Sequence, residues 1–198
     1  GTGDVRVANG HAGRVDYEAT DLGVTARAGK YLVDLERELR KYGQMLAFEP
    51  PHFGSAATLG GCVAAGLSGP RRASAGAVRD FVLGVRMLDG KGDDLNFGGQ
   101  VMKNVAGYDV SRLMTGSMGT LGLLLEVSLK VLPLPARELT LRLPLTEADA
   151  INRMNLWAGK PLPLSATSFC DSPRTYRLSA TAPTSRAAHT HPASDKLV

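Results

Sequence analysis

Residues 49–66, EPPHFGSAATLGGCVAAG, decide the fold of this chain. A Pro-Pro turn leads to Thr58, whose hydroxyl can cap a helix that begins with Gly60 and Gly61 and continues through small apolar residues. The start of a helix carries N–H groups without intrahelical partners and the positive end of the macrodipole. Because glycine lacks the Cβ atom that would hold a ligand away, the stretch predicts a backbone site for an anion.

A second glycine-bearing stretch, GSMGTLG, occupies residues 116–122. Together the two stretches predict a cradle for a phosphate or a dinucleotide. The alternative is that the glycines serve only tight turns and helix packing, and for either stretch alone that alternative is favoured. Two such stretches in one short chain favour the cradle.

The composition is that of a soluble globular protein. The 198 residues are 43% hydrophobic and 21% charged, which allows one real core. The net charge of +4 suits an anionic ligand, but no Lys/Arg block alternates with aromatic residues, which argues against a nucleic-acid partner. Cys62 and Cys170 are too few for a disulfide framework and have no metal-ligand spacing with a histidine, so we expect a cytoplasmic protein without a metal site. No run of residues is apolar enough to cross a bilayer.

Alternating apolar residues predict several strands before Pro133. These strands fall within residues 13–28, at 81–87, at 93–97 and at 125–131, with a hairpin turn at 89–92. In the last strand, one face is expected to carry Leu125, Val127, Leu129 and Val131. Helices are predicted over residues 31–42, ending at Gly43, and over 109–114, where Asp109 is the N-cap.

Pro133 and Pro135 mark a boundary, after which a second α+β unit begins. A strand is predicted at 139–143, a helix at 147–157 and another strand at 162–169. From Asp171 onward the chain is rich in Ala, Ser, Thr and Pro without apolar periodicity, which predicts disorder.

Neither glycine stretch has the Rossmann frame, and the P-loop pattern is absent too. The pattern that fits consists of PPHFGSAATLGG at 50–61, Arg79-Asp80 before a strand, KNVAGYD at 103–109 and GSMGTLGLLLEV at 116–127. These motifs resemble the FAD-binding domain of the vanillyl-alcohol oxidase (PCMH-type) flavoproteins. Within that family the chain is most similar to the FAD-binding subunits of bacterial glycolate oxidase (glycolate dehydrogenase) complexes. The resemblance covers about residues 16–169, and VMKNVAGYD at 101–109 is its most specific part.

The resemblance implies an α+β fold in which two subdomains, with an antiparallel sheet and flanking helices, hold FAD between them and a cap domain follows. The implied domains are an FAD-binding domain at 1–136, the beginning of the cap at 137–170 and a disordered tail at 171–198. The residues implied to line the flavin and pyrophosphate are Gly54, Thr58, Leu59, Gly60 and Gly61. Those implied around the pyrophosphate, ribose or adenine are Gly116, Ser117, Gly119, Gly122 and Leu123.

The implied activity is oxidation of a small 2-hydroxy acid, such as glycolate or D-lactate, to the 2-oxo acid, with FAD as hydride acceptor. The implied partners are a second flavoprotein subunit and an iron–sulfur subunit, through which the protein would lie peripherally at the inner membrane. No catalytic residue is assigned. Two alternatives stay open: a non-catalytic flavin- or nucleotide-binding assembly module, and a binder of nucleic acid or acidic surfaces, against which the dispersed basic residues count.

The sequence departs from the family pattern at both ends. The family has an earlier Arg- and Gly-rich pyrophosphate loop, and the cap domain extends beyond Phe169. We therefore expect a fragment that binds FAD weakly or not at all by itself.

Several individual residues can be explained by a structural role as well as by a role at the cofactor site. Arg79-Asp80 is as well explained by a loop-locking pair as by a place near the flavin, and Lys103 and Arg112 either offset phosphate charge or are solvated. His52 is expected to be a hydrogen-bonded loop histidine, and Cys62 a packed core residue.

Overall fold

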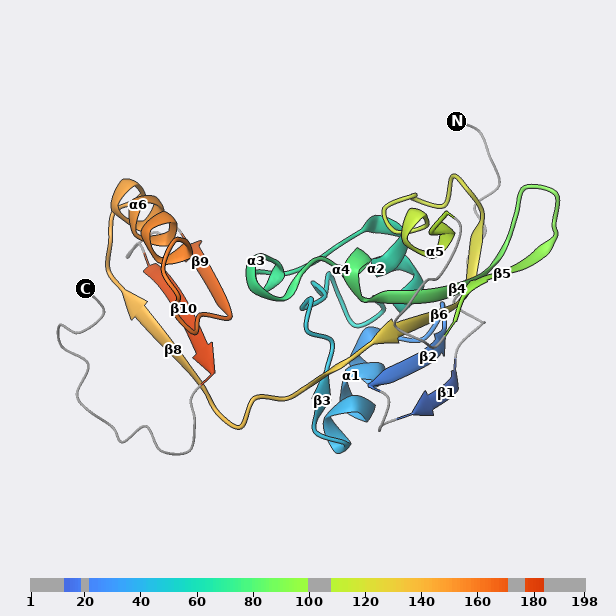
Figure 1. The fold of residues 1–198 in the computed structure, drawn as a ribbon, viewed down its shortest axis with the longest axis horizontal. Coiled ribbons are helices and arrows are strands. Elements are labelled where there is room, and N and C mark those ends of the chain that lie inside the picture. Colours follow the sequence, from blue (N-terminus) through green and yellow to red (C-terminus); the bar gives the residue numbers. More distant parts are fainter. Residues whose placement is uncertain (1–12, 19–21, 100–107, 171–176, 184–198) are drawn as a thin grey trace. The chain divides into compact units, whose positions relative to one another are not determined.

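The computed structural model describes residues 13–18, 22–99, 108–170 and 177–183, and the chain divides into two compact units at Leu134/Pro135. In the first unit (Figure 1) the strands are β1 (Arg14–Glu18), β2 (Gly23–Arg27), β3 (Gln44–Met45), β4 (Val82–Leu88), β5 (Asp94–Gly98), β6 (Leu123–Lys130) and β7 (Leu132–Pro133). Its helices are α1 (Leu32–Lys41), α2 (Leu59–Ala65), α3 (Arg72–Ala75), α4 (Val78–Phe81) and α5 (Val110–Leu113).

The first unit is built on a five-stranded antiparallel sheet in the order β1-β2-β6-β4-β5. The central strand β6 pairs Val127 with Ala26 of β2 on one side and with Val85 of β4 on the other. All four predicted strand regions of this unit are confirmed, although the third strand begins at Val82 because Phe81 ends helix α4. Residues 72–81, for which no helix was predicted from the sequence, contain the short helices α3 and α4.

The face of β6 differs in one detail from the predicted alternation. Val127, Leu129 and Val131 are buried as expected, but Leu124 is buried as well, and Leu125 is only half-buried. The pairing of β6 with β4 shifts register between Arg86 and Met87, and such a bulge reverses the side-chain alternation beyond it. The simple period of two therefore fails at the start of the strand.

Helix α1 forms where the leucine spacing predicts it. Leu32, Leu35 and Leu39 face the core, and each is at most 1% exposed. Burying a leucine side chain contributes about 1.5–3 kcal/mol, so this face anchors the helix. Gly43 follows the helix with φ of 67°, the left-handed conformation that glycine adopts without strain.

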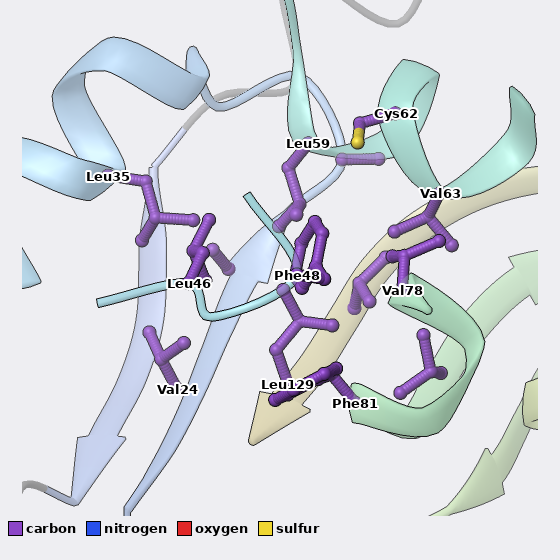
Figure 2. Packing of buried hydrophobic residues seen from close by; sticks show 14 of the residues in the cluster. Val24, Leu35, Leu46, Phe48, Leu59, Cys62, Val63, Val78, Phe81 and Leu129 are labelled. Carbon is purple, nitrogen blue, oxygen red and sulfur yellow. The ribbon is translucent and has the colours of Figure 1, made fainter. Parts of the chain in front are cut away.

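The core of the first unit gathers around the segment that follows β3. Figure 2 shows side chains from the helices and the sheet packed about Phe48, which is fully buried. Its ring centroid lies 5.5 Å from that of Phe81 in a tilted arrangement. Leu59 and Val63 of α2 belong to the same cluster, so the glycine-rich helix is held firmly by its apolar face.

The second unit consists of strands β8 (Glu138–Leu143), β9 (Ala166–Cys170) and β10 (Arg177–Pro183) and helix α6 (Glu147–Ala158). The sheet order is β8-β10-β9, and Ala150 and Trp157 of α6 form a small buried cluster. Thr146 caps α6 by accepting a hydrogen bond from the Asp149 amide at 3.2 Å.

Two expectations for this unit are wrong. The strand expected at 162–169 begins only at Ala166, and residues 177–183, expected to be disordered, form the central strand β10. Backbone pairing with both neighbours stabilises β10, in which Leu178 is the one large apolar residue. Across the described ranges, no helix is long and apolar enough to span a membrane.

Candidate functional site

The start of helix α2 has the predicted cap. Thr58 is extended, with φ of −106° and ψ of 156°, and its Oγ1 accepts a hydrogen bond from the Gly61 amide at 3.2 Å. The helix ends at Gly66 in the left-handed conformation. The local sequence thus determines both ends of this seven-residue helix.

The amides at this helix start are not free, and this part of the prediction is wrong. The Leu59 amide donates to the Lys30 carbonyl at 2.9 Å, and the Gly60 amide donates to the Ala28 carbonyl at 2.8 Å. With the Gly61 amide bound to Thr58, the first turn is satisfied by protein acceptors. The segment that follows β2 runs against the helix start and supplies the carbonyls that the sequence left unassigned.

Gly60 and Gly61 have different roles in the structure. Gly60 is buried, and a Cβ there would lie 2.6 Å from the Ala28 Cβ, so this glycine permits close packing of the helix on the segment after β2. Gly61 is exposed, and a Cβ there would meet only the Thr58 Oγ1 at 3.0 Å. Leu59 is fully buried in the core. Of these residues, Gly61 and Thr58 are the ones that face a pocket.

This pocket, with a volume of about 370 Å³, lies beside the start of α2. Its wall is mostly apolar and is formed by Leu32, Pro51, Phe53, Gly54, Ala56, Ala57, Thr58, Gly61, Cys62 and Leu67. Phe53 is 83% exposed, which is unusual for a phenylalanine. An apolar pocket with one hydroxyl and an exposed aromatic side chain is suited to a planar ring system.

The second glycine stretch contacts the other end of α2. The Gly116 amide donates to the Val63 carbonyl at 3.0 Å, and the Met118 amide donates to the Ala64 carbonyl at 2.8 Å. A seven-residue helix is about 10 Å long, so the two glycine stretches lie at opposite ends of α2. The structure brings both stretches to one helix, but not to one anion site.

The loop at residues 115–119 contains two buried hydroxyl oxygens without a partner among the described residues, Thr115 Oγ1 and Ser117 Oγ. Gly116, Met118 and Gly119 have positive φ of 82°, 53° and 76°, so the loop is tightly wound. A buried hydroxyl without a hydrogen bond is uncommon in folded proteins. The pair indicates a place where a bound ligand would supply the missing partners.

Gly122 and Leu123 have a structural explanation. A Cβ at Gly122 would lie 2.4 Å from the Leu88 carbonyl oxygen, so only glycine allows the chain to approach β4 here. Leu123 then begins β6 and pairs with Leu88. Neither residue has an unpartnered polar side chain that would point to a ligand.

Other candidate residues take the structural roles expected of them. Asp109 caps α5 by accepting from the Arg112 amide at 3.0 Å and forms an ion pair with the Arg112 guanidinium at 3.3 Å. Asp80 accepts from the Ala77 amide at 2.9 Å and thereby locks the turn before α4, whereas Arg79 is exposed. Lys103 and most of the motif at 101–109 lie outside the described residues.

His52 and Cys62 lie near the pocket. His52 Nε2 is 3.3 Å from Glu36 Oε2, in agreement with a structural loop histidine. Cys62 is buried, and its thiol donates to the Leu67 carbonyl at 3.5 Å. Burial, with a smaller contribution from the Glu36 charge, raises the pKa of Cys62 to about 11, so the thiol stays protonated and unreactive at neutral pH.

Sequence reasoning missed Thr115 and the apolar pocket residues. Thr115 directly precedes the glycine stretch, but only its burial distinguishes it from an ordinary threonine. Phe53 is part of the PPHFGSAATLGG motif at 50–61, and an aromatic residue between the Pro-Pro turn and Gly54 was the one sequence signal for the pocket. In the part of the chain that the structure describes, no group of three His, Cys, Asp or Glu side chains could hold a metal ion.

Comparison with known proteins gives a consistent set of relatives. A family model described as "FAD binding domain" matches residues 2–112. The chain is 51% identical over 177 residues to glycolate oxidase subunit GlcE of Escherichia coli (strain K12), covering 89% of this chain and 51% of that protein. It is 32% identical over 163 residues to glycolate oxidase subunit GlcD of Bacillus subtilis (strain 168), covering 80% of this chain and 34% of that protein.

A D-lactate dehydrogenase of Archaeoglobus fulgidus is 34% identical over 153 residues, or 76% of this chain and 34% of that protein. The chain therefore spans about half the length of GlcE and about a third of the other two. Among solved structures, an alkyldihydroxyacetonephosphate synthase aligns with a TM-score of 0.65 at 23% identity, over 79% of this chain and 28% of that protein. That similarity shows the fold alone.

Proposed function

Since the chain belongs to the FAD-binding domain family of PCMH type, we propose that it is the FAD-binding subunit of a glycolate oxidase-like complex. The complex would oxidise a small 2-hydroxy acid, such as glycolate or D-lactate, to the 2-oxo acid. The observation that carries the proposal is 51% identity to GlcE over 89% of the chain. Relatives named D-lactate dehydrogenase support the same class of substrate.

The described residues fit FAD in two places. The apolar pocket at Gly54, Thr58 and Gly61 suits the planar ring, and the wall beside it would shield one face of that ring from water. The hydroxyls of Thr115 and Ser117 would donate to an oxygen of the phosphate or ribose part, which would satisfy two buried groups at once.

The remaining site residues would shape the cofactor site rather than contact the cofactor through side chains. Gly60 and Gly122 allow close packing, and Leu59 anchors α2 in the core. Gly116 and Gly119 provide the tight winding that buries Ser117, and Leu123 starts the strand that follows. When bound, FAD supplies a two-electron acceptor for the hydride from the substrate α-carbon.

Partner subunits would receive the electrons. Cys62 and Cys170 are fewer than the four thiolates that an iron–sulfur cluster takes, so these 198 residues do not supply a cluster. A second flavoprotein subunit and an iron–sulfur subunit would complete the chain of carriers. Association with them would also bring the protein to the inner membrane from the cytoplasmic side.

A second candidate function is a flavin-binding module that assembles the complex without turning over substrate. It is favoured by the lack of a convincing general base among the described residues near the pocket. His52 does not line the pocket, and the Cys62 thiol is held protonated by its raised pKa.

Spectroscopy of the whole gene product that carries these residues tests the proposal. We expect a flavin absorbance spectrum that glycolate or D-lactate bleaches under anaerobic conditions, and that acetate, which lacks the 2-hydroxyl group, leaves unchanged. A flavin spectrum that no 2-hydroxy acid bleaches, with the partner subunits present, would favour the assembly module. A purified protein that neither contains nor takes up flavin would overturn both.

A further inference from the structure

The outer wall of the apolar pocket is a segment with few backbone anchors. Pro51, Phe53 and Gly54 line the pocket from this segment. Pro50 and Pro51 have no N–H to donate, and Gly54 adds backbone freedom with φ of 146°. Within the described residues, the hydrogen bond from the Ala57 amide to the Gly54 carbonyl, at 3.3 Å, holds only the end of the segment.

A side-chain pair holds the middle of this segment. His52 lies between two pocket residues but does not line the pocket itself, and its Nε2 is 3.3 Å from Glu36 Oε2 of α1. The two side chains are 33% and 26% exposed, so solvent screens this contact less than it would a fully exposed pair.

Helix α1 is a rigid support for this contact. Glu36 follows Leu32 by one helical turn, so both lie on the same side of α1, and Leu32 is fully buried and lines the pocket. The Leu32 amide also donates to the Ala57 carbonyl at 2.9 Å, which ties α1 to the far end of the wall. The pair therefore connects the middle of a loop that has few backbone anchors to a helix that is fixed in the core.

We propose that His52 and Glu36 are a positioning pair that holds Pro51 and Phe53 as a wall against which the flavin ring packs. The inference rests on the proposed function, because it names the ring as the occupant of the pocket. Neither His52 nor Glu36 touches the ring; they act through the two residues that flank His52. Without the pair, the wall would lose its fixed position and the ring its packing surface.

A double-mutant cycle of Glu36→Ala and His52→Ala in the whole gene product tests the pair. We expect each single variant to weaken FAD binding about fivefold, as for the loss of one half-buried polar contact, and the double variant to be no weaker than either one. The visible absorbance bands of the bound flavin should shift in all three variants. Glu36→Gln keeps an oxygen acceptor at the same reach and should restore most of the affinity.

Asp34→Ala is the matched control, because Asp34 forms an exposed ion pair with Arg37 at 2.6 Å on the same helix. It should leave FAD affinity and the flavin spectrum unchanged. A second readout, hydrogen exchange of the amides at 52–57 in the flavin-free protein, should be faster in Glu36→Ala and His52→Ala than in the wild type and Asp34→Ala.

The outcomes separate this inference from the proposed function. Additive losses in the double variant, or a loss of stability with unchanged FAD affinity and spectrum, would overturn the positioning role. If the wild-type protein bound no FAD, the proposed function would fail, and the ring would not be the occupant. Hydrogen exchange would then still decide whether the pair fixes the wall, and exchange unaffected by Glu36→Ala would refute that too.

Discussion

Replacing Ser117 with alanine should change stability and FAD affinity in opposite directions. Ser117 Oγ is buried without a partner among the described residues, and such a group destabilises a protein by about 1–3 kcal/mol. Ser117→Ala removes that group without leaving a large cavity, so we expect the free energy of unfolding of the flavin-free protein to rise by about 1 kcal/mol. FAD affinity should fall about tenfold or more, because a hydrogen bond to a charged group contributes about 1.5–3 kcal/mol and each 1.4 kcal/mol is tenfold.

Urea denaturation of the flavin-free protein and calorimetric titration with FAD measure the two effects. Ser111→Ala is the control, because the Ser111 hydroxyl is also buried but donates to the Phe97 carbonyl at 3.0 Å. The control should lose about 1 kcal/mol of stability and keep its FAD affinity. If Ser117→Ala destabilised the protein as the control does and bound FAD normally, the loop at 115–119 would not be part of the cofactor site.

Three further predictions concern residues with structural roles. Asp109→Asn should keep both its stability and its bound flavin because asparagine caps equally well, whereas Asp109→Ala should lose about 1 kcal/mol of stability, measured by thermal unfolding. Lost activity at normal flavin content in Asp109→Asn would instead reveal a catalytic group. The folded-state pKa of Cys62 is raised to about 11, above its ordinary value near 9, so the native state keeps a proton that the unfolded state loses, and the free energy of unfolding should fall as pH rises from 9 to 11. Cys62→Ala should flatten this pH dependence in denaturation curves, and an unchanged dependence of stability on pH would contradict the buried thiol. Gly60→Ala should destabilise the fold severely, because its Cβ would lie 2.6 Å from the Ala28 Cβ, whereas Gly90→Ala in open space should be nearly neutral; equal melting temperatures would refute the close packing.

Local sequence patterns predicted the elements whose stability is local. The leucine spacing of α1, the threonine cap of α2, the aspartate cap of α5 and the alternation in β6 from Val127 onward all correspond to observed structure. In each of these the signal and its physical cause lie within one helix or strand. The hairpin between β4 and β5 was predictable for the same reason.

Features that depend on distant partners could not be predicted. The amides of Leu59 and Gly60 bond to carbonyls at residues 30 and 28, so the helix start that looked free is satisfied by another segment. β10 forms through pairing with β8 and β9, and its own residues, with Leu178 the one large apolar side chain among them, give only a weak apolar signal. The burial of Thr115 and Ser117 likewise follows from the packing of their loop on the end of α2.

Calorimetric titration of the whole gene product with FAD, in the wild type and in Gly61→Val, tests the central claim most directly. Gly61 is exposed and lines the apolar pocket, so valine there should block the pocket while the fold is retained. Gly90→Val, where an added Cβ meets nothing within 4 Å, is the matched control. We predict saturable one-to-one binding in the wild type and the control, and loss of binding in Gly61→Val with an unchanged circular dichroism spectrum. Equal FAD affinity in all three proteins would contradict the account.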